Sequence, residues 1–221
     1  MKLECAAVLF DMDGTLVDST AVVERAWAGW AARHGIPLAD VLTFSHGRRT
    51  ADTLAHFRPE VDYSIELAEL EDYEETVTDG IIAVKGAEAA VIAAQAGAWG
   101  VVTSAPRQLA EIRLTIAGLP LPQVLVTADR IGRGKPHPEG FLRAAEELGV
   151  APAECLVFED TAPGIEAGVR AGMQVVGLLT TVPRKQLGCE WIINDFRDVH
   201  LQKRDSGFEI FLRLASPEQL L

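Results

Sequence analysis

Long apolar runs and paired cysteines are both absent from this 221-residue chain. Although 48% of the residues are hydrophobic, no stretch approaches the roughly 18 to 20 apolar residues that a membrane span requires. The first residues also lack the basic and then apolar pattern of a signal peptide. Three widely spaced cysteines form neither a disulfide framework nor a metal-binding pattern. We therefore expect a cytoplasmic protein with reduced thiols.

Positive charge is scarce as well. The chain has 20 lysines and arginines against 32 aspartates and glutamates, which gives a net charge of −12. Nucleic acids and anionic lipids require a basic face, so we predict neither as a partner. A small anionic metabolite remains compatible if the binding site supplies its own local positive charge. We expect a monomer or a weak homo-oligomer.

Short apolar runs that alternate with helical patterns predict the fold. Continuous apolar strands between helices are typical of a parallel sheet that is covered on both faces. We predict an α/β protein with a Rossmann-like parallel core and helices on both faces. The predicted strands are Ala6–Phe10, Trp99–Thr103, Val124–Val126, Cys155–Phe158 and Gln174–Leu179, and the helices between them are Gly86–Ala96, Gln108–Ala117, Glu139–Leu148 and Gly164–Ala171.

An inserted helical segment follows the first strand. Helical patterns run over Thr20–His34, Arg49–Phe57 and Ser64–Val77, without a strand signal of the core type between them. We predict a core of residues 1–17 and 83–221 and an α-helical cap of residues 18–82. Trp27 and Trp30, three apart on one helix, are expected to pack inside the cap. In the tail, Phe208–Leu212 resembles a strand. It is expected to pair either with the edge of the sheet or with a partner chain.

The most informative feature is a pair of aspartates, Asp11 and Asp13, directly after the first apolar strand. If the chain stays extended, the two side chains lie on the same face. Two neighbouring carboxylates repel each other unless a cation or a proton lies between them. A solvated or helix-capping pair is the structural alternative, so the pair alone does not establish a site.

Polar residues also follow other predicted strands. Thr103 and Ser104 end one strand, Glu159 and Asp160 end another, and Lys135 lies in a loop before a helix. Each has an ordinary alternative, as a helix cap, a partner of a helix dipole or a surface lysine. Ligands of open α/β sheets bind at the carboxyl ends of the strands. Together the set suits phosphoryl transfer to a carboxylate, with hard oxygen ligands for Mg²⁺ and a lysine for the phosphate charge.

Four motifs in this order resemble those of the haloacid dehalogenase-like hydrolase superfamily, in its branch of sugar-phosphate phosphatases and phosphomutases with a helical cap. They are Asp11-x-Asp13-Gly14-Thr15-Leu16-x-Asp18-Ser19, Thr103, Lys135-Pro136-x-Pro138 and Glu159-Asp160-Thr161-x-x-Gly164-Ile165-x-Ala167-x-x-x-Ala171-Gly172. The resemblance covers about residues 5 to 195. Further similarity to bacterial sugar and hexitol phosphatases lies in Glu24-Arg25-Ala26-Trp27, Ser45-His46-Gly47-Arg48 and Thr103-Ser104.

The resemblance implies a role for each matching residue. Asp11 would be the nucleophile that becomes aspartyl-phosphate, and Asp13 would be the general acid and base. The implied Mg²⁺ ligands are the Asp11 carboxylate, the Asp13 backbone carbonyl and Asp160, with Glu159 acting directly or through water. The implied phosphate-binding residues are Thr103, Ser104 and Lys135. We expect a Mg²⁺-dependent hydrolase of small phosphomonoesters, most consistent with sugar or sugar-alcohol phosphates.

Departures from the family patterns separate the alternatives. Dehalogenases and ATPase pumps lack the acid at Asp13, and phosphonoacetaldehyde hydrolases need a cap lysine, of which residues 20–80 have none. Phosphomutases of the β-phosphoglucomutase type use a cap histidine where this chain has Val23, so hydrolysis is favoured over isomerisation. The phosphomutase and a catalytically silent binding protein on the same fold are the alternatives.

The cap loop with His46, Gly47 and Arg48 is the predicted specificity region. Polar side chains beside a glycine suit a ligand that is rich in hydroxyl groups. Ordinary helix capping and a solvated arginine are the structural alternatives. We therefore expect these residues to face the core when the cap is closed over the substrate.

Overall fold

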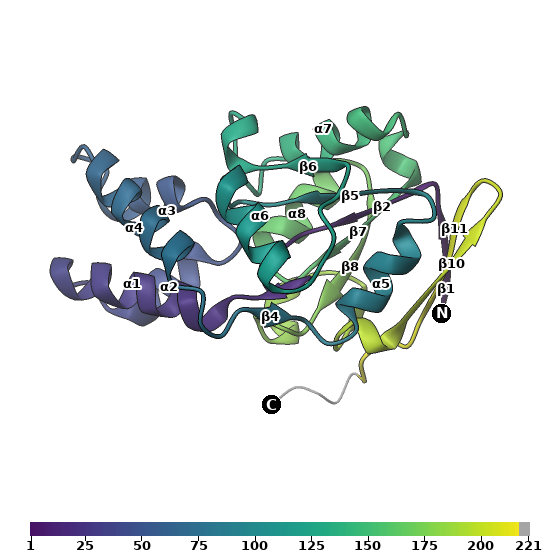
Figure 1. Ribbon diagram of the computed structural model, residues 1–221, viewed down its shortest axis with the longest axis horizontal. Helices are drawn as coiled ribbons and strands as arrows, with labels where there is room; N and C mark the ends of the chain where they lie inside the picture. Colours follow the sequence, from purple (N-terminus) through teal and green to yellow (C-terminus); the bar gives the residue numbers. More distant parts are fainter. Residues whose placement is uncertain (217–221) are drawn as a thin grey trace.

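A six-stranded, fully parallel sheet forms the centre of the computed structural model, which describes residues 1–216 (Figure 1). The strand order is β6-β5-β2-β7-β8-β9. The strands are β2 (Ala7–Phe10), β5 (Ala98–Val102), β6 (Val124–Val126), β7 (Cys155–Glu159), β8 (Gln174–Leu178) and β9 (Trp191–Ile193). The five predicted core strands are confirmed within one or two residues, and β9 was not predicted. All residues of β2 and β7 are buried, as expected for central parallel strands.

Helices cover both faces of this sheet, which confirms the predicted fold class. The covering helices are α5 (Ala87–Ala94), α6 (Arg107–Ile116), α7 (Glu139–Leu148), α8 (Ala162–Arg170) and α9 (Arg184–Leu187), with short 3₁₀ helices at Ala128–Arg130, Pro152–Glu154 and Phe196–Asp198. Buried residues of α5 and α6 pack in one hydrophobic cluster with one face of the strands. Those of α7 and α8 pack in a second cluster with the opposite face.

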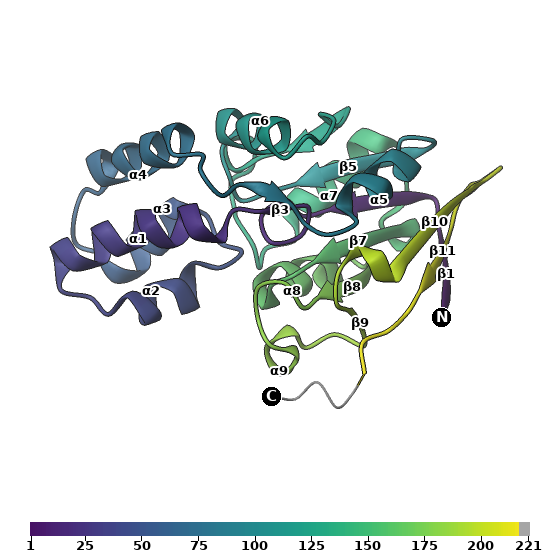
Figure 2. The same ribbon diagram turned by 60° about the horizontal axis from the view of Figure 1, so that its bottom comes forward.

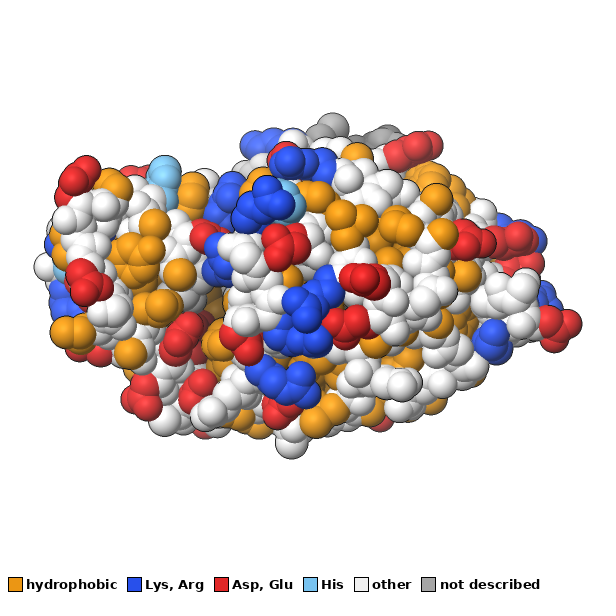
Figure 3. Space-filling model, turned by 90° about the horizontal axis from the view of Figure 1, so that it is seen from above, with side chains coloured by type: hydrophobic (Ala, Val, Ile, Leu, Met, Phe, Trp, Pro, Cys, Tyr) orange, Lys and Arg blue, Asp and Glu red, His pale blue; other side chains and the backbone are white. Residues whose placement is uncertain are grey.

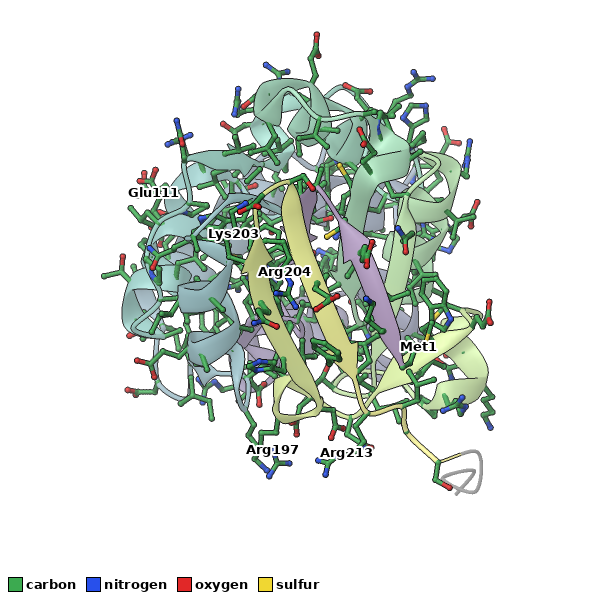
Figure 4. The ribbon with its side chains drawn as sticks, turned by 90° about the vertical axis from the view of Figure 1, so that its right-hand side faces the viewer. Met1, Glu111, Arg197, Lys203, Arg204 and Arg213 are labelled. Atoms are coloured by element: carbon green, nitrogen blue, oxygen red, sulfur yellow. The ribbon has the colours of Figure 1, made fainter. Side chains whose placement is uncertain are left out.

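A second, antiparallel sheet contains the tail of the described chain (Figure 4). It has the order β1-β11-β10 and consists of β1 (Lys2–Cys5), β11 (Gly207–Leu212) and β10 (Val199–Arg204). The predicted strand at Phe208–Leu212 is confirmed, but it pairs with β1 and β10 and not with the edge of the parallel sheet. The inner side chains of this small sheet join the cluster of α5 and α6. Residues 217–221 of the predicted core lie outside the described residues.

Four helices of the inserted segment form a separate group beside the core (Figure 2). They are α1 (Thr20–His34), α2 (Leu38–Ser45), α3 (Thr50–Phe57) and α4 (Ser64–Thr76). The group has its own hydrophobic cluster, in which Trp27 and Trp30 meet edge to face with ring centres 5.5 Å apart. The expected packing of both tryptophans is therefore observed. Helix α2 was not predicted.

Two short strands join the helical group to the core. Strand β3 (Val17–Asp18) pairs antiparallel with β4 (Ile82–Ala83), so the two chain segments that enter and leave the helices lie side by side. The predicted boundaries at 17/18 and 82/83 fall within this pair, and we retain them as a proposed division into core and cap. Among the described residues, no helix is long and apolar enough to cross a membrane.

Candidate active site

A cleft of about 100 Å³ lies between the carboxyl ends of the core strands and the cap. Its walls include most of the predicted site residues: Asp11, Asp13, Thr103, Ser104 and Asp160 from the core, and His46, Gly47 and Arg48 from the cap. Lys135 and Glu159 are not part of the wall but lie buried behind Asp11. The strand-end clusters that are far apart in the sequence are therefore adjacent in the fold.

Asp11 continues the line of β2 beyond its last strand residue. Its backbone N–H donates to the carbonyl of Phe158 at 3.0 Å, which extends the pairing with β7 and fixes the start of the side chain. The carboxylate accepts a hydrogen bond from Nζ of Lys135. Burial raises the pKa of Asp11 well above its usual value, and the positive charge of Lys135 opposes this shift. Asp11 is therefore a buried carboxyl group that one ammonium partner holds in position in the wall of the cleft.

Glu159 connects that ammonium group to the following helix. Its Oε1 accepts from Nζ of Lys135 at 2.6 Å, while Oε2 accepts from the backbone N–H groups of Asp160 and Thr161 at 2.7 and 2.8 Å. The Thr161 hydroxyl donates to the same Oε2 at 2.9 Å. Gly164 leaves room for this carboxylate, since a Cβ there would lie 1.6 Å from Oε1. Both oxygens are engaged, so Glu159 orients Lys135 and the start of α8. This arrangement fits a contact between Glu159 and a metal through water better than direct ligation.

Asp160 has an unpartnered oxygen. Its Oδ1 accepts from the Thr15 hydroxyl at 2.8 Å, whereas Oδ2 is buried without a hydrogen-bond partner. Burial raises the pKa of Asp160 to about 7, and the neighbouring Glu159 charge contributes. Gly14, with a φ of +84°, passes so close that a Cβ would lie 2.0 Å from Oδ2. The Thr181 hydroxyl offsets part of the rise in the pKa of Asp160, and a buried carboxylate oxygen with so little hydrogen bonding favours a proton or a bound cation.

The donor set fits a hard divalent cation. Ligand oxygens of Asp11, Glu159 and Asp160 lie within 4.8 Å of one another, and all three side chains are buried. Lys135 supplies one positive charge against these three carboxylates. Oxygen ligands with an uncompensated negative charge suit Mg²⁺, which keeps several waters of its own. The cluster can therefore hold such an ion. Asp11 and Asp160 are the better candidates for direct ligands, because both oxygens of Glu159 already accept hydrogen bonds.

Asp13 reaches the cleft by a route that the sequence did not predict. The chain does not stay extended after Asp11, because the carbonyl of Met12 accepts from the N–H groups of the following turn. Asp13 is partly exposed, and its Oδ1 accepts from the Ser19 hydroxyl at 2.7 Å. A guanidinium nitrogen of Arg113 lies 2.9 Å from the same oxygen. Asp11 and Asp13 therefore each have a cationic partner of their own, instead of sharing one.

The two hydroxyl residues after β5 differ in their surroundings. Thr103 is buried at the strand end, where its N–H donates to the carbonyl of Val126 at 2.9 Å and its Oγ1 accepts from the N–H of Ala105 at 3.0 Å. The Ser104 hydroxyl instead donates to the carbonyl of Gly47 in the cap at 2.9 Å. Both line the cleft. Ser104 therefore also holds the cap against the core, a contact that the sequence did not indicate.

The predicted cap loop faces the core, as its three residues all line the cleft. Gly47 has a φ of +75°, and a Cβ there would lie 2.3 Å from the Thr161 hydroxyl oxygen. The guanidinium of Arg48 lies over the Phe44 ring at 4.5 Å. Burial lowers the pKa of His46, although the charge of Glu24 opposes the shift. The cap is closed over the strand ends in this structure.

Sequence reasoning missed several residues of the cleft. The Ser19 hydroxyl donates to Asp13 and the Thr15 hydroxyl donates to Asp160, but the motif that contains Ser19 and Thr15 did not show these contacts. Arg113 and Glu74 line the cleft and pair at 2.9 Å. One signal could have revealed Arg113: it falls on the buried stripe of α6, among Leu109, Ala110 and Leu114.

Comparison with known proteins agrees with this geometry. Residues 5–172 match the family model of the haloacid dehalogenase-like hydrolases. The chain belongs to this family. It is 41% identical over 211 residues to hexitol phosphatase A of Escherichia coli, covering 93% of this chain and 98% of that protein. It is 39% identical to validoxylamine A 7'-phosphate phosphatase of Streptomyces hygroscopicus, with 86% and 94% covered.

A solved structure shares most of this architecture. The crystal structure of a hydrolase from Pseudomonas syringae superimposes with a TM-score of 0.75 at 28% sequence identity, covering 86% of this chain and 94% of that one. The match therefore extends beyond the parallel sheet to most of the described elements.

Proposed function

We propose that the protein is a Mg²⁺-dependent phosphatase that hydrolyses small phosphomonoesters, specifically sugar or sugar-alcohol phosphates, through an aspartyl-phosphate intermediate. One observation carries the proposal. Two carboxylates line the same cleft beneath the cap. Asp11 pairs with Lys135, whereas Asp13 pairs with Ser19 and Arg113. This is the arrangement that separate nucleophilic and proton-transfer roles require.

In the first step an Asp11 oxygen attacks the phosphorus atom and forms an acyl-phosphate bond. The ester P–O bond breaks, and protonated Asp13 donates its proton to the leaving alcohol oxygen. Lys135 and the hydroxyl of Thr103 stabilise the charge on the phosphoryl oxygens. Asp11 and Asp160 would hold a Mg²⁺ ion, which would neutralise further negative charge on the phosphoryl group.

In the second step the Asp13 carboxylate accepts a proton from a water molecule as that water attacks the phosphorus atom. The bond between phosphorus and Asp11 breaks, and inorganic phosphate is released. Asp13 is protonated again and Asp11 is a free carboxylate, so the cycle is complete. Val23 lines the cap wall of the cleft and cannot transfer a proton, which supports water over a second substrate hydroxyl as the acceptor.

The cap wall supports a polyhydroxylated substrate. Glu24, Ser45, His46 and Thr50 line the cleft and offer neutral and acidic hydrogen-bonding groups for hydroxyls, with Arg48 as the cap's cation there. Known ligand pockets measure about 300–1,000 Å³, so the cleft of about 100 Å³ has to widen by cap movement before a sugar phosphate enters. The similarity to hexitol phosphatase A favours the same substrate class.

The surface and the thiols support the remaining parts of the proposal. On the face seen in Figure 3, basic side chains are interspersed with acidic ones and do not form a continuous basic patch. A small phosphorylated metabolite suits this distribution better than a nucleic acid. Cys5, Cys155 and Cys189 are free thiols, which supports a reducing cytoplasm. A monomer or weak homo-oligomer completes the proposal.

The test is a phosphate-release screen of sugar, polyol and nucleotide monophosphates with Mg²⁺, run beside Asp11→Asn. We expect the wild-type protein to release phosphate from sugar or polyol phosphates and the variant to lose at least about 10⁴-fold in kcat. Activity retained in the variant would remove Asp11 as the nucleophile. Absence of Mg²⁺-dependent hydrolysis would support a silent binding protein, and an isomerised product would support the phosphomutase.

A further inference from the structure

Arg113 and Lys135 are the two buried cationic side chains among residues 1–216. Lys135 belongs to the strand-end cluster, whereas Arg113 lies in the middle of α6, with its side chain 3% exposed. Its Nη1 lies 2.9 Å from Oδ1 of Asp13, and its Nη2 donates to Oε1 of Glu74 at 2.9 Å. Arg113 therefore connects a carboxylate of the cleft to a carboxylate of the cap.

Stability alone is a weak reason for this buried network. Burial opposes the charge of Arg113, and the carboxylates of Asp13 and Glu74 raise its pKa overall. Burial also raises the pKa of Glu74, against the effect of Arg113. In addition, Nε of Arg113 is buried without a hydrogen-bond partner. Apolar residues of similar volume often replace such a buried ion pair without loss of stability. A functional reason is the better explanation for a guanidinium at this position.

The contact with Asp13 restricts one oxygen of the carboxylate. Oδ1 accepts a hydrogen bond from the Ser19 hydroxyl at 2.7 Å and also pairs with Arg113. Two partners on one oxygen fix the rotation of the carboxyl plane. The other oxygen, Oδ2, then remains for the substrate.

The contact with Glu74 depends on the position of the cap. Glu74 is near the end of α4, and its side chain packs against α6 of the core. The next residue, Glu75, accepts a hydrogen bond from Gln108 of the same core helix at 2.7 Å. Movement of α4 away from α6 would separate Glu74 from Arg113. The guanidinium would then lose one of its two carboxylate partners.

We propose that Arg113 is a positioning residue that holds Asp13 ready for proton transfer when Glu74 of the closed cap pairs with it. This inference rests on the proposed phosphatase activity, in which Asp13 protonates the leaving oxygen. Cap closure over the substrate and correct placement of the acid are thereby linked through one side chain. An open cap holds the acid less well, which limits attack on phosphorus before the site is closed to water.

The test compares two esters that differ in their need for a proton. A sugar-alcohol phosphate such as glucitol 6-phosphate releases an alkoxide that has to be protonated, whereas p-nitrophenyl phosphate releases a stable phenolate. We expect Arg113→Met to lower kcat/KM about 100-fold for the alkyl ester and less than about 3-fold for the aryl ester, the size of effect typical of a general acid. Arg113→Lys should recover part of the loss. Because kcat/KM reports steps through cleavage of the ester bond, slower hydrolysis of the intermediate does not enter.

Three further variants keep the comparison decisive. Glu74→Gln, which leaves the Arg113–Asp13 pair in place, should show the same ester dependence at about 10-fold. The double variant Arg113→Met/Glu74→Met removes both partners of the buried ion pair. It replaces the single variant in the comparison if Arg113→Met does not fold. Arg130→Gln is the matched control, because it breaks an arginine–carboxylate pair with Glu147 at 2.8 Å outside the cleft. It should change neither ester.

Each outcome separates the two proposals. Equal losses for both esters, or no loss, would overturn a positioning role for Arg113. A wild-type-like Glu74→Gln would overturn the link to the cap. If Asp13→Asn fails to reproduce the ester dependence, the acid itself is misassigned and the inference falls with it. If the wild-type protein hydrolyses neither ester, the proposed function has failed, irrespective of Arg113.

Discussion

The two buried cations in the described part of the chain, residues 1–216, have contrasting surroundings. Lys135 pairs with Asp11 and Glu159, and all three residues belong to the core. Arg113 pairs with Asp13 of the core and Glu74 of the cap. The first cluster persists whatever the cap does, whereas the second is complete only with α4 against α6. A fixed centre suits the proposed nucleophile and metal, and a conditional centre suits control over when the proposed acid is in place.

Breaking the fixed centre should have the largest effect. Lys135→Met leaves Asp11 and Glu159 buried with no cationic partner, so we expect kcat to fall about 10³-fold and the free energy of unfolding to fall by about 3–5 kcal/mol. Phosphate release and urea denaturation measure the two effects. Lys185→Met is the control, because Lys185 is exposed and should tolerate the same substitution. Comparable activity in the two variants would show that Lys135 does not act on the phosphoryl group.

The same centre should give the metal-free protein an unusual pH dependence. The pKa of Asp160 is raised to about 7 in the fold, so the folded chain binds more protons than the unfolded chain between about pH 4 and 7. Stability then falls as the pH rises through this window. With EDTA present, wild type should lose on the order of 2 kcal/mol relative to Asp160→Asn between pH 5 and 8.

Mg²⁺ should reverse this loss, because a bound cation offsets the buried carboxylate charges. Urea denaturation at the two pH values, with EDTA and then with excess Mg²⁺, provides the measurement. An identical pH dependence of wild type and Asp160→Asn in EDTA would contradict the prediction.

On the cap side, Gly47→Ala should block closure. A Cβ at Gly47 would lie 2.3 Å from the Thr161 hydroxyl oxygen, and the φ of +75° adds backbone strain. We expect kcat/KM to fall about 10-fold while the core remains folded. Gly35→Ala is the matched control, since Gly35 has a φ of +66° with no atom within 4 Å of the new Cβ. If both variants lose the same activity, strain and not the clash is responsible.

The smallest effect is expected for Ser104→Ala. Its hydroxyl donates to the carbonyl of Gly47, so the substitution removes one partly buried hydrogen bond, which contributes about 1 kcal/mol to cap closure. We expect KM to rise a few-fold with kcat within about 2-fold. Steady-state kinetics distinguish this from direct phosphate binding, for which kcat would fall by about 100-fold or more.

The same contrast explains what could be predicted from the sequence. The parallel strands are continuous apolar runs and their polar ends carry recognisable motifs, so the neighbourhood of Asp11, Lys135 and Asp160 was foreseeable. The second centre was not, because Glu74 lies on an acidic helix, and the charges of such a helix ordinarily face solvent. No local pattern tells which residue of α4 meets which residue of α6. That pairing is defined only once the two helices pack together, because Glu74 and Arg113 are 39 positions apart in the chain.

Two of the three strands of the small sheet, β1 and β10, were missed for a related reason. Strand β10 is a charged edge strand, and among its residues only Leu201 is buried. Strand β1 has four residues, and its partner follows about two hundred positions later. Short strands of this kind give almost no periodic signal, since their stability comes from the partner and from packing on the core.

That distant pairing also bears on how the molecule is made. Leu3 lies opposite Ile210, and the N-terminal amino group donates to the carbonyl of Leu212 at 2.8 Å. During synthesis, the segment of Lys2–Cys5 therefore waits for nearly the whole chain before its neighbour emerges from the ribosome. Until then the apolar cluster beneath α5 lacks one of its covers. The nascent protein depends on its last strands to shield that surface, and a polypeptide halted before Gly207 would expose it to aggregation.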